Sequence, residues 1–131
     1  MKRLHVSISV DDLAASVSFY STLFDAKPAV LELDYAKWVL DDPSVNFTIE
    51  ARGDSAGLDH LGLQVDTVEE VDEIADRLSA ANVPMRARRR VSCCYARSDK
   101  AWSKDPQKVR WEIFRTAERI PTYSEGGCEC D

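Results

Sequence analysis

The stretch His5-Val6-Ser7-Ile8-Ser9-Val10-Asp11 recurs 55 positions later as His60-Leu61-Gly62-Leu63-Gln64-Val65-Asp66. A second pair of segments follows nearly the same shift. Trp38…Asp42-Pro43…Phe47-Thr48-Ile49 corresponds to Trp102…Asp105-Pro106…Trp111-Glu112-Ile113, with small differences in length. The repetition predicts two similar modules packed as pseudo-symmetric mates. In this arrangement the two histidines of the chain occupy equivalent positions, and Thr48 is the counterpart of Glu112.

The size and charge of the chain narrow the classes of function. Its 131 residues suit one compact domain, and a hydrophobic content of 44% can fill a core. A net charge of −6 and a pI near 4.9 argue against nucleic-acid binding, because phosphates would be repelled. The basic exception is a cluster of arginines, which is read either as a solvated strand face or as a positive field that attracts anions or lowers a thiol pKa. Its members are Arg86, Arg88, Arg89 and Arg90.

The distribution of apolar residues along the sequence argues against a membrane-spanning segment. No apolar run approaches the roughly 20 residues of a membrane span. Residues 1–5 lead directly into an alternating strand pattern and do not resemble a signal peptide. We therefore expect a cytoplasmic protein whose four cysteines are reduced, so that reactive or metal-binding roles outrank disulfides.

In the first half, residues 4–10 alternate with a period of two, which predicts a strand with one aliphatic and one polar face. Asp11 or Asp12 can cap the helix that follows. One stripe of this helix carries Leu13, Val17, Tyr20 and Phe24. Three strands are expected next, over residues 29–33, 35–40 and 45–51.

The second half repeats this order. A strand is expected over residues 58–65, and Thr67 and Glu70 have the spacing of a capping box. The helical stripe after it carries Val68, Val71, Ala75 and Leu78. The pattern then predicts strands over residues 85–91, 93–97, 100–103 and 108–116.

Each half therefore reads β-α-β-β-β. We expect an α+β fold in which two tandem βαβββ modules form curved sheets around a metal-binding cleft. The first module covers residues 1–56 and the second residues 57–116 of one domain. Residues 117–131 form a polar C-terminal tail.

The repeat also predicts a metal site. A single histidine early in a strand is most often structural or exposed, but here both histidines fall on the polar faces of equivalent strands. Glu112 lies in an apolar strand, where a buried carboxylate is costly without a cation. Two imidazoles and one carboxylate form the ligand set of non-haem iron(II), and Mn, Ni, Co or Zn can occupy the same ligands. The prediction is a metal held by His5, His60 and Glu112.

The adjacent thiols of Cys93 and Cys94 suggest a second function. Neighbouring Cα atoms are about 3.8 Å apart, below the usual disulfide span of roughly 4.4–6.8 Å, so a vicinal disulfide would be strained. One interpretation is a buried cysteine beside an incidental one. The other is a pair that binds arsenic, cadmium or mercury, which requires a bulge or loop because side chains alternate along a strand.

The double βαβββ pattern resembles the vicinal oxygen chelate superfamily, which includes glyoxalase I, extradiol dioxygenases and bleomycin resistance proteins. In that superfamily the metal ligands come from the first and last strands of each module. The resemblance places His5, His60 and Glu112 on three of these four strands. Thr48 takes the fourth position, where a poor ligand leaves that side of the metal open.

A narrower resemblance covers about residues 1–116. The run Cys93-Cys94-Tyr95-Ala96-Arg97-Ser98-Asp99-Lys100-Ala101-Trp102, followed by Asp105-Pro106 and Trp111-Glu112, is similar to the ArsI/CadI group. This group comprises organoarsenical carbon–arsenic lyases and cadmium-induced proteins. Where the group usually has an Asp-Pro-x-Gly turn, this chain has Asp105-Pro106-Gln107-Lys108.

The resemblance implies cleavage of the carbon–arsenic bond of trivalent organoarsenicals, dependent on iron(II) and dioxygen. Methylarsonous acid would give arsenite and formaldehyde. Cys93 and Cys94 would bind the arsenic as thiolates. The alternatives are a non-catalytic protein that sequesters cadmium or arsenite, and a generic glyoxalase or dioxygenase. Superfamily members are often dimers, so a homodimer is one option.

Further residues flank the predicted site. Tyr95, Lys37, Lys104, Asn46 and Thr48 are candidate cleft residues, and the first four suit a surface or packing role equally well. The tail thiols of Cys128 and Cys130 are either an accessory metalloid trap or incidental.

Overall fold

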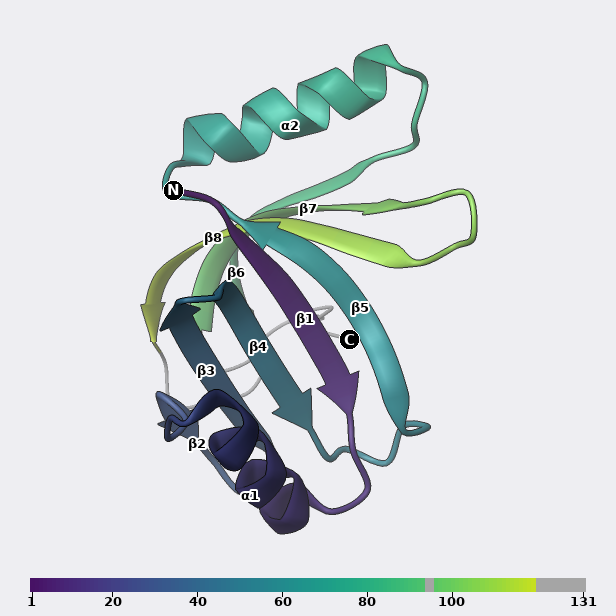
Figure 1. Ribbon diagram of the computed structural model, residues 1–131. Helices are drawn as coiled ribbons and strands as arrows, with labels where there is room; N and C mark the ends of the chain where they lie inside the picture. The colour runs from purple at the N-terminus through teal and green to yellow at the C-terminus, as the bar shows by residue number, and fades with distance from the viewer. Residues whose placement is uncertain (94–95, 120–131) are drawn as a thin grey trace. The chain divides into compact units, whose positions relative to one another are not determined.

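In the computed structural model, residues 1–93 and 96–119 are described (Figure 1). They fall into two compact units: one contains residues 4–60, and the other contains residues 1–3 together with residues from 61 onward. One boundary, between residues 60 and 61, lies inside β5 (Gly57–Gln64), and the other, between residues 3 and 4, lies inside β1 (Arg3–Ser9). Within each half the element order is β-α-β-β-β, so the predicted α+β class and tandem βαβββ pattern are confirmed.

The unit of residues 4–60 is built around a four-stranded arrangement in the order β2-β3-β4-β1. Its strands are β1 (Arg3–Ser9), β2 (Val30–Leu31), β3 (Tyr35–Asp41) and β4 (Ser44–Glu50). β1 and β4 run parallel, whereas β2–β3 and β3–β4 are antiparallel. The predicted strand over residues 29–33 is shortened to the two residues of β2.

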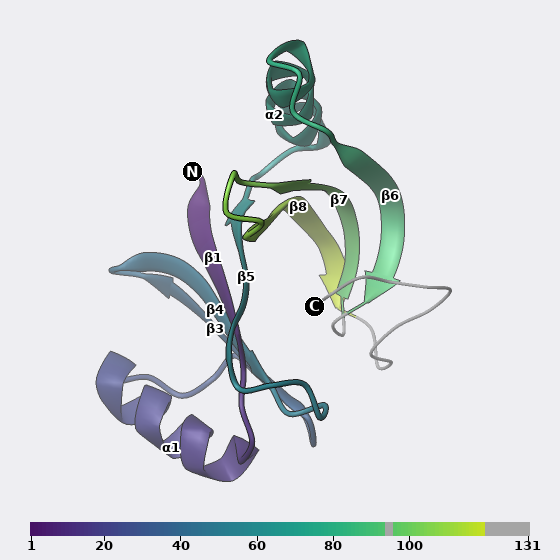
Figure 2. The ribbon, with the colours of Figure 1, turned by 90° about the vertical axis from the view of Figure 1, so that its right-hand side faces the viewer.

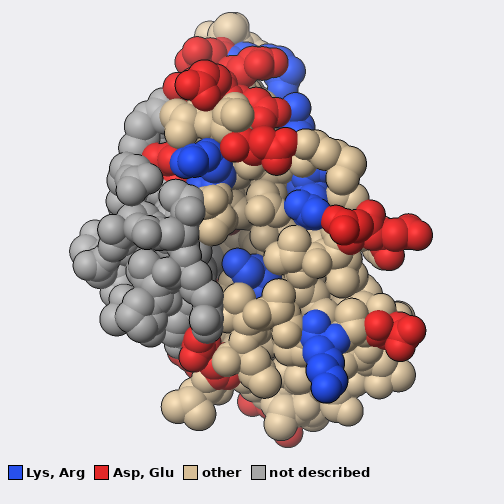
Figure 3. Space-filling model, turned by 90° about the vertical axis from the view of Figure 1, so that its left-hand side faces the viewer, with Lys and Arg blue, Asp and Glu red and all other residues tan. Residues whose placement is uncertain are grey.

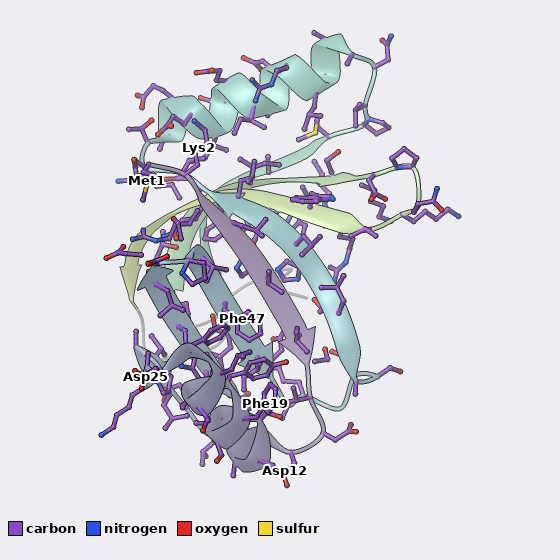
Figure 4. The ribbon with its side chains drawn as sticks, viewed as in Figure 1. Met1, Lys2, Asp12, Phe19, Asp25 and Phe47 are labelled. Carbon is purple, nitrogen blue, oxygen red and sulfur yellow. The ribbon has the colours of Figure 1, made fainter. Side chains whose placement is uncertain are left out.

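Helix α1 (Leu13–Phe24) covers one face of these strands (Figures 1 and 2). Asp12 caps its beginning by accepting a hydrogen bond from the backbone N–H of Ala15, and Asp25 ends it with φ 51°. In Figure 4 Phe47 points from β4 toward this helix. The predicted helical stripe packs on a core of Ala36, Trp38, Val45, Phe47 and Ile49.

In the other unit the strand order is β5-β8-β7-β6. Its strands beyond β5 are β6 (Arg86–Cys93), β7 (Ala96–Lys104) and β8 (Arg110–Arg119). Helix α2 (Val68–Ala80) packs on β7 and β8 around Val65, Val71, Ile74, Ala101 and Ile113 (Figure 2). The predicted stripe included Val71 but not Ile74, whose side chain is 5% exposed.

Two strand predictions in this half were wrong. Residues 93–97 and 100–103 were expected to be separate strands, but Cys93 ends β6 and β7 runs without interruption from Ala96 to Lys104. Cys93 pairs with Ala96 in the antiparallel ladder of β6 and β7. β8 also continues to Arg119, beyond the predicted end at residue 116, because Ala96 and Arg97 of β7 pair with Arg119 and Glu118.

The start of α2 carries a concentration of charge. Thr67 and Glu70 form the predicted capping box. The Lys2 ammonium lies 3.2 Å from Glu70 and, through its hydrogen bond, lowers the pKa of this carboxyl. The N-terminal ammonium hydrogen-bonds to Asp66 and lowers the pKa of that carboxyl too. Figure 4 shows Met1 and Lys2 beside this end of α2, and Figure 3 shows the acidic side chains gathered over the helix.

The repeat is visible in hydrogen-bond register as well as in sequence. In the first half the first and last strands are parallel, with Ser7 opposite Thr48. In the second half they are again parallel, with Gly62 opposite Glu112. Gly62 follows Ser7 by the same 55 positions that separate the histidines, so Thr48 and Glu112 occupy equivalent backbone positions.

No helix among the described residues is long and apolar enough to span a membrane.

Candidate metal centre

Two buried imidazoles face each other in the unit of residues 4–60. His5 lies on β1 and is 5% exposed; His60 lies on β5 and is 1% exposed. Their Nε2 atoms are 3.1 Å apart, and their rings are tilted by 50° with centroids 5.0 Å apart. The two histidines that the repeat placed at equivalent positions therefore meet through the same ring atom.

The opposite nitrogen of each ring fixes its tautomer. Nδ1 of His60 lies 2.7 Å from a carboxylate oxygen of Asp59, which can only accept a hydrogen bond from a ring N–H. Nδ1 of His5 lies 3.1 Å from the backbone carbonyl oxygen of Asn46, which is also an acceptor. Both Nδ1 atoms therefore donate, and in the neutral rings each Nε2 carries a lone pair.

This geometry fits a bound metal ion. Two lone pairs held 3.1 Å apart repel each other unless a cation, either a metal ion or a proton, lies between them. Two nitrogens that bind one ion at right angles, each about 2.1 Å from it, are about 3.0 Å apart. Metal-binding histidines characteristically donate their second nitrogen to a carboxylate or a backbone carbonyl, as Asp59 and Asn46 allow here. Asn46, a predicted cleft residue, also has its side-chain Oδ1 3.1 Å from Nδ1 of His5.

Glu112 lies on β8 in the other unit and is 5% exposed. Its Oε2 is 2.6 Å from the Nζ of Lys100, which is 3% exposed. A cation for this buried carboxylate is thus already present in the protein, so its burial alone does not require a metal. The case for Glu112 as a ligand rests instead on its position in the repeat and on the family pattern.

A second buried carboxylate lies near the end of β4. Glu50 is 1% exposed, accepts a 3.3 Å hydrogen bond from Ser7 Oγ and pairs with Arg52. The Arg52 guanidinium also donates to Asp34 at 3.1 Å. Hydrogen bonds and ion pairs within the protein thus compensate the buried charge of Glu50.

The remaining predicted residues differ in how the structure places them. Thr48 is buried on β4, with the half-buried Lys37 opposite it on β3. Lys104 is exposed at the end of β7 and lines a pocket. Cys93 is the last residue of β6, and the prediction for its thiol lies outside the described side chains. The predictions for Cys94, Tyr95, Cys128 and Cys130 lie outside the described residues.

Sequence reasoning missed two neighbours of the proposed ligands. Asp59 precedes His60 directly, yet residues adjacent in an ideal strand point to opposite faces, so alternation alone argued against their contact. Lys100 was visible only as part of the run that resembled the ArsI/CadI group. Its contact with Glu112 depends on the register of β7 and β8, in which Trp102 is opposite Glu112.

Comparison with known proteins identifies relatives of the whole chain. Residues 2–113 match the family model described as the Glyoxalase/Bleomycin resistance protein/Dioxygenase superfamily. A trivalent organoarsenical cleaving enzyme of Bacillus sp. (strain MD1) is 40% identical over 127 residues, which cover 95% of this chain and 79% of the relative. A probable trivalent organoarsenical cleaving enzyme of Bacillus subtilis (strain 168) is 35% identical over 132 residues, which cover 99% of this chain and 90% of the relative. The cadmium-induced protein CadI of Mycobacterium tuberculosis (strain ATCC 25618 / H37Rv) is 33% identical over 127 residues, which cover 96% of this chain and 84% of the relative.

Solved structures share the fold at low identity. An extradiol ring-cleaving dioxygenase from B. fuscum matches with a TM-score of 0.68 at 19% identity, over 90% of this chain and 33% of that chain. A Mn(II)-bound glyoxalase from Novosphingobium aromaticivorans matches with a TM-score of 0.66 at 16% identity, over 98% of this chain and 44% of that chain. At these identities the likeness concerns the fold alone.

Proposed function

The chain belongs to the glyoxalase/bleomycin resistance protein/dioxygenase superfamily, and from that premise we propose that it is an enzyme that cleaves the carbon–arsenic bond of trivalent organoarsenicals. The observation that carries the proposal is its 40% identity, over 95% of its length, to a trivalent organoarsenical cleaving enzyme. The facing imidazoles of His5 and His60 support a metal-dependent reaction.

The proposed metal ligands are His5, His60 and Glu112. Asp59 and Asn46 would hold the imidazoles in the tautomer that presents Nε2 to the ion. Lys100 would hold the Oε2 atom of Glu112 and so fix the position of the carboxylate. We propose iron(II), which supplies activation of dioxygen when it is bound.

The proposed role of Cys93 and Cys94 is to bind trivalent arsenic as thiolates and so hold the substrate in place. Fixing the substrate relative to the site removes most of the entropic cost of bringing the reactants together. The overall reaction balances: methylarsonous acid and dioxygen give arsenous acid and formaldehyde. For this role we also expect a cytoplasmic location, and a homodimer stays a prediction.

The test is a comparison of arsenite release with and without oxygen. The full chain is purified without oxygen, loaded with iron(II) and given methylarsonous acid. Arsenite formed only when both iron and oxygen are present supports the proposal, whereas failure to form arsenite under every condition contradicts it. Cys93→Ser and Cys94→Ser should abolish turnover while iron content stays unchanged. Activity that survives both substitutions would favour a generic glyoxalase or dioxygenase.

A second candidate function is sequestration of cadmium or arsenite, favoured by the 33% identity to the cadmium-induced protein CadI. This function predicts that metalloid stays bound in stoichiometric amounts without product. Equilibrium dialysis against cadmium and arsenite, run beside the arsenite-release assay, separates the two candidates.

A further inference from the structure

A pocket of about 590 Å³ lies in the unit that contains α2, at the start of β6 and the ends of β7 and β8 that meet there. Its volume is within the range of small-molecule sites. Its described lining includes the cations Arg86, Lys104 and Arg110 and no acidic residue. The apolar part of the wall comes from Pro84, Met85 and Trp102.

The pairing of neighbouring strands places these cationic residues close to one another and to Trp102. Lys104 lies directly opposite Arg110 in the β7–β8 ladder, and Arg86 lies opposite Trp102 in the β6–β7 ladder. The Arg110 guanidinium lies 5.4 Å from the centre of the Trp102 ring. Like charges directly opposite each other destabilise a sheet. An anion in the pocket would lie among these cations, in a chain whose net charge is −6.

We propose that this pocket binds a negatively charged organic group, with its charge on Lys104 and Arg110 and its apolar body on Trp102. The pocket adjoins the proposed metal ligand, because Trp102 is opposite Glu112 and Arg110 precedes it by two residues on β8. The consequence for substrate choice rests on the proposed function. The enzyme prefers organoarsenicals whose organic group carries a carboxylate over those whose organic group is neutral.

The first test uses two probes of nearly equal shape, benzoate and neutral benzamide, titrated into the metal-free full chain and followed by ligand-observed NMR. Benzoate should bind at least about fivefold more tightly, and its affinity should fall as salt is added. Lys104→Gln should weaken benzoate binding by about three- to tenfold, the loss expected for one charge-assisted contact. Lys108→Gln is the matched control, because it removes the same charge from an exposed residue outside the pocket lining.

Equal affinity for the two probes, or equal effects of Lys104→Gln and Lys108→Gln, would overturn the inference. Because Lys104 is exposed, its substitution should not perturb folding, and a circular dichroism spectrum checks this.

The second test compares kcat/KM for 2-carboxyethylarsonous acid and its neutral amide, with methylarsonous acid as the reference. In all three the arsenic-bearing carbon carries hydrogens, so dioxygen can convert that carbon to an aldehyde as arsenous acid is released. A preference for the carboxylate that Lys104→Gln removes supports the inference, and no preference overturns it. If methylarsonous acid itself is not cleaved, the proposed function fails, while the benzoate titration still decides whether the pocket binds anions.

Discussion

At the scale of single residues, the described part of the proposed site consists of buried groups whose orientation is set by neighbours. His5 and His60 meet at 3.1 Å because their Nδ1 atoms are held by the Asn46 carbonyl and by Asp59. Glu112 is held in the other unit by Lys100. Each proposed ligand thus has a partner that fixes it, and these partners give the site its most direct tests.

Substitution of Asp59 should weaken metal binding without unfolding the protein. Asp59→Ala removes the acceptor that keeps the proton of His60 on Nδ1, so we expect metal affinity to fall by about 10- to 100-fold. Asp54→Ala is the control, because Asp54 is an exposed acid in the same unit. Competitive metal titration with a chelator gives the affinity of both variants. Affinity within twofold of the parent for Asp59→Ala would contradict the assigned role.

Lys100 should matter for stability even without metal. Lys100→Met removes the ammonium group that lies 2.6 Å from the buried carboxylate of Glu112, and we expect the free energy of unfolding to fall by about 3–5 kcal/mol. Adding Glu112→Gln to this variant should recover part of the loss. Urea unfolding in the presence of a chelator measures both, with the exposed Lys104→Met as control. An equal effect of Lys100→Met and Lys104→Met would show that the ion pair contributes little.

At the scale of elements, the turn before β8 departs from the family pattern. Asp105 Oδ1 accepts hydrogen bonds from the N–H groups of Gln107 and Val109, at 2.8 and 2.9 Å. Lys108 has φ 66°, a left-handed conformation that favours glycine. The chain therefore adopts a left-handed conformation at a non-glycine residue, at the cost of local strain just before the strand that carries Glu112.

Glycine at this position should stabilise the protein. We expect Lys108→Gly to raise the free energy of unfolding by about 0.5–1 kcal/mol, because it removes the penalty for a side chain in the left-handed region. Gln107→Gly is the matched control and should destabilise, since Gln107 is not among the residues with positive φ. Thermal unfolding of the two variants checks the signs. A Lys108→Gly variant no more stable than the control would refute the strain argument.

At the scale of the whole molecule, the proposed ligands come from both compact units: His5 and His60 from one, and Glu112 from the other. A metal bound to all three would link the stabilities of the two units. At a free metal concentration 100 times Kd, binding should add about 2.7 kcal/mol to the free energy of unfolding.

Hydrogen exchange tests this linkage. Metal should slow amide exchange in β1 and in β8 alike, measured by mass spectrometry with and without the ion. Glu112→Gln should reduce the protection of β8 more than that of β1. Protection confined to β1 in the parent protein would exclude Glu112 from the ligand set.

The sequence by itself determined the order of elements and the equivalence of the two halves. Both follow from local patterns: alternation in residues 4–10, the helical stripes, the Thr67–Glu70 cap and the 55-residue repeat. The sequence also indicated which residues share equivalent strand positions, as the register of Thr48 and Glu112 confirms.

Only the tertiary structure decided the lengths of β7 and β8, the contact of His5 with His60, and the pairing of Glu112 with Lys100. These features depend on which residues of neighbouring strands lie opposite each other, and a local pattern carries no information about that choice. Pairing with Ala96 and Arg97 of β7 carries β8 on to Arg119, and the buried charge of Glu112 is compensated by the lysine that the register brings beside it.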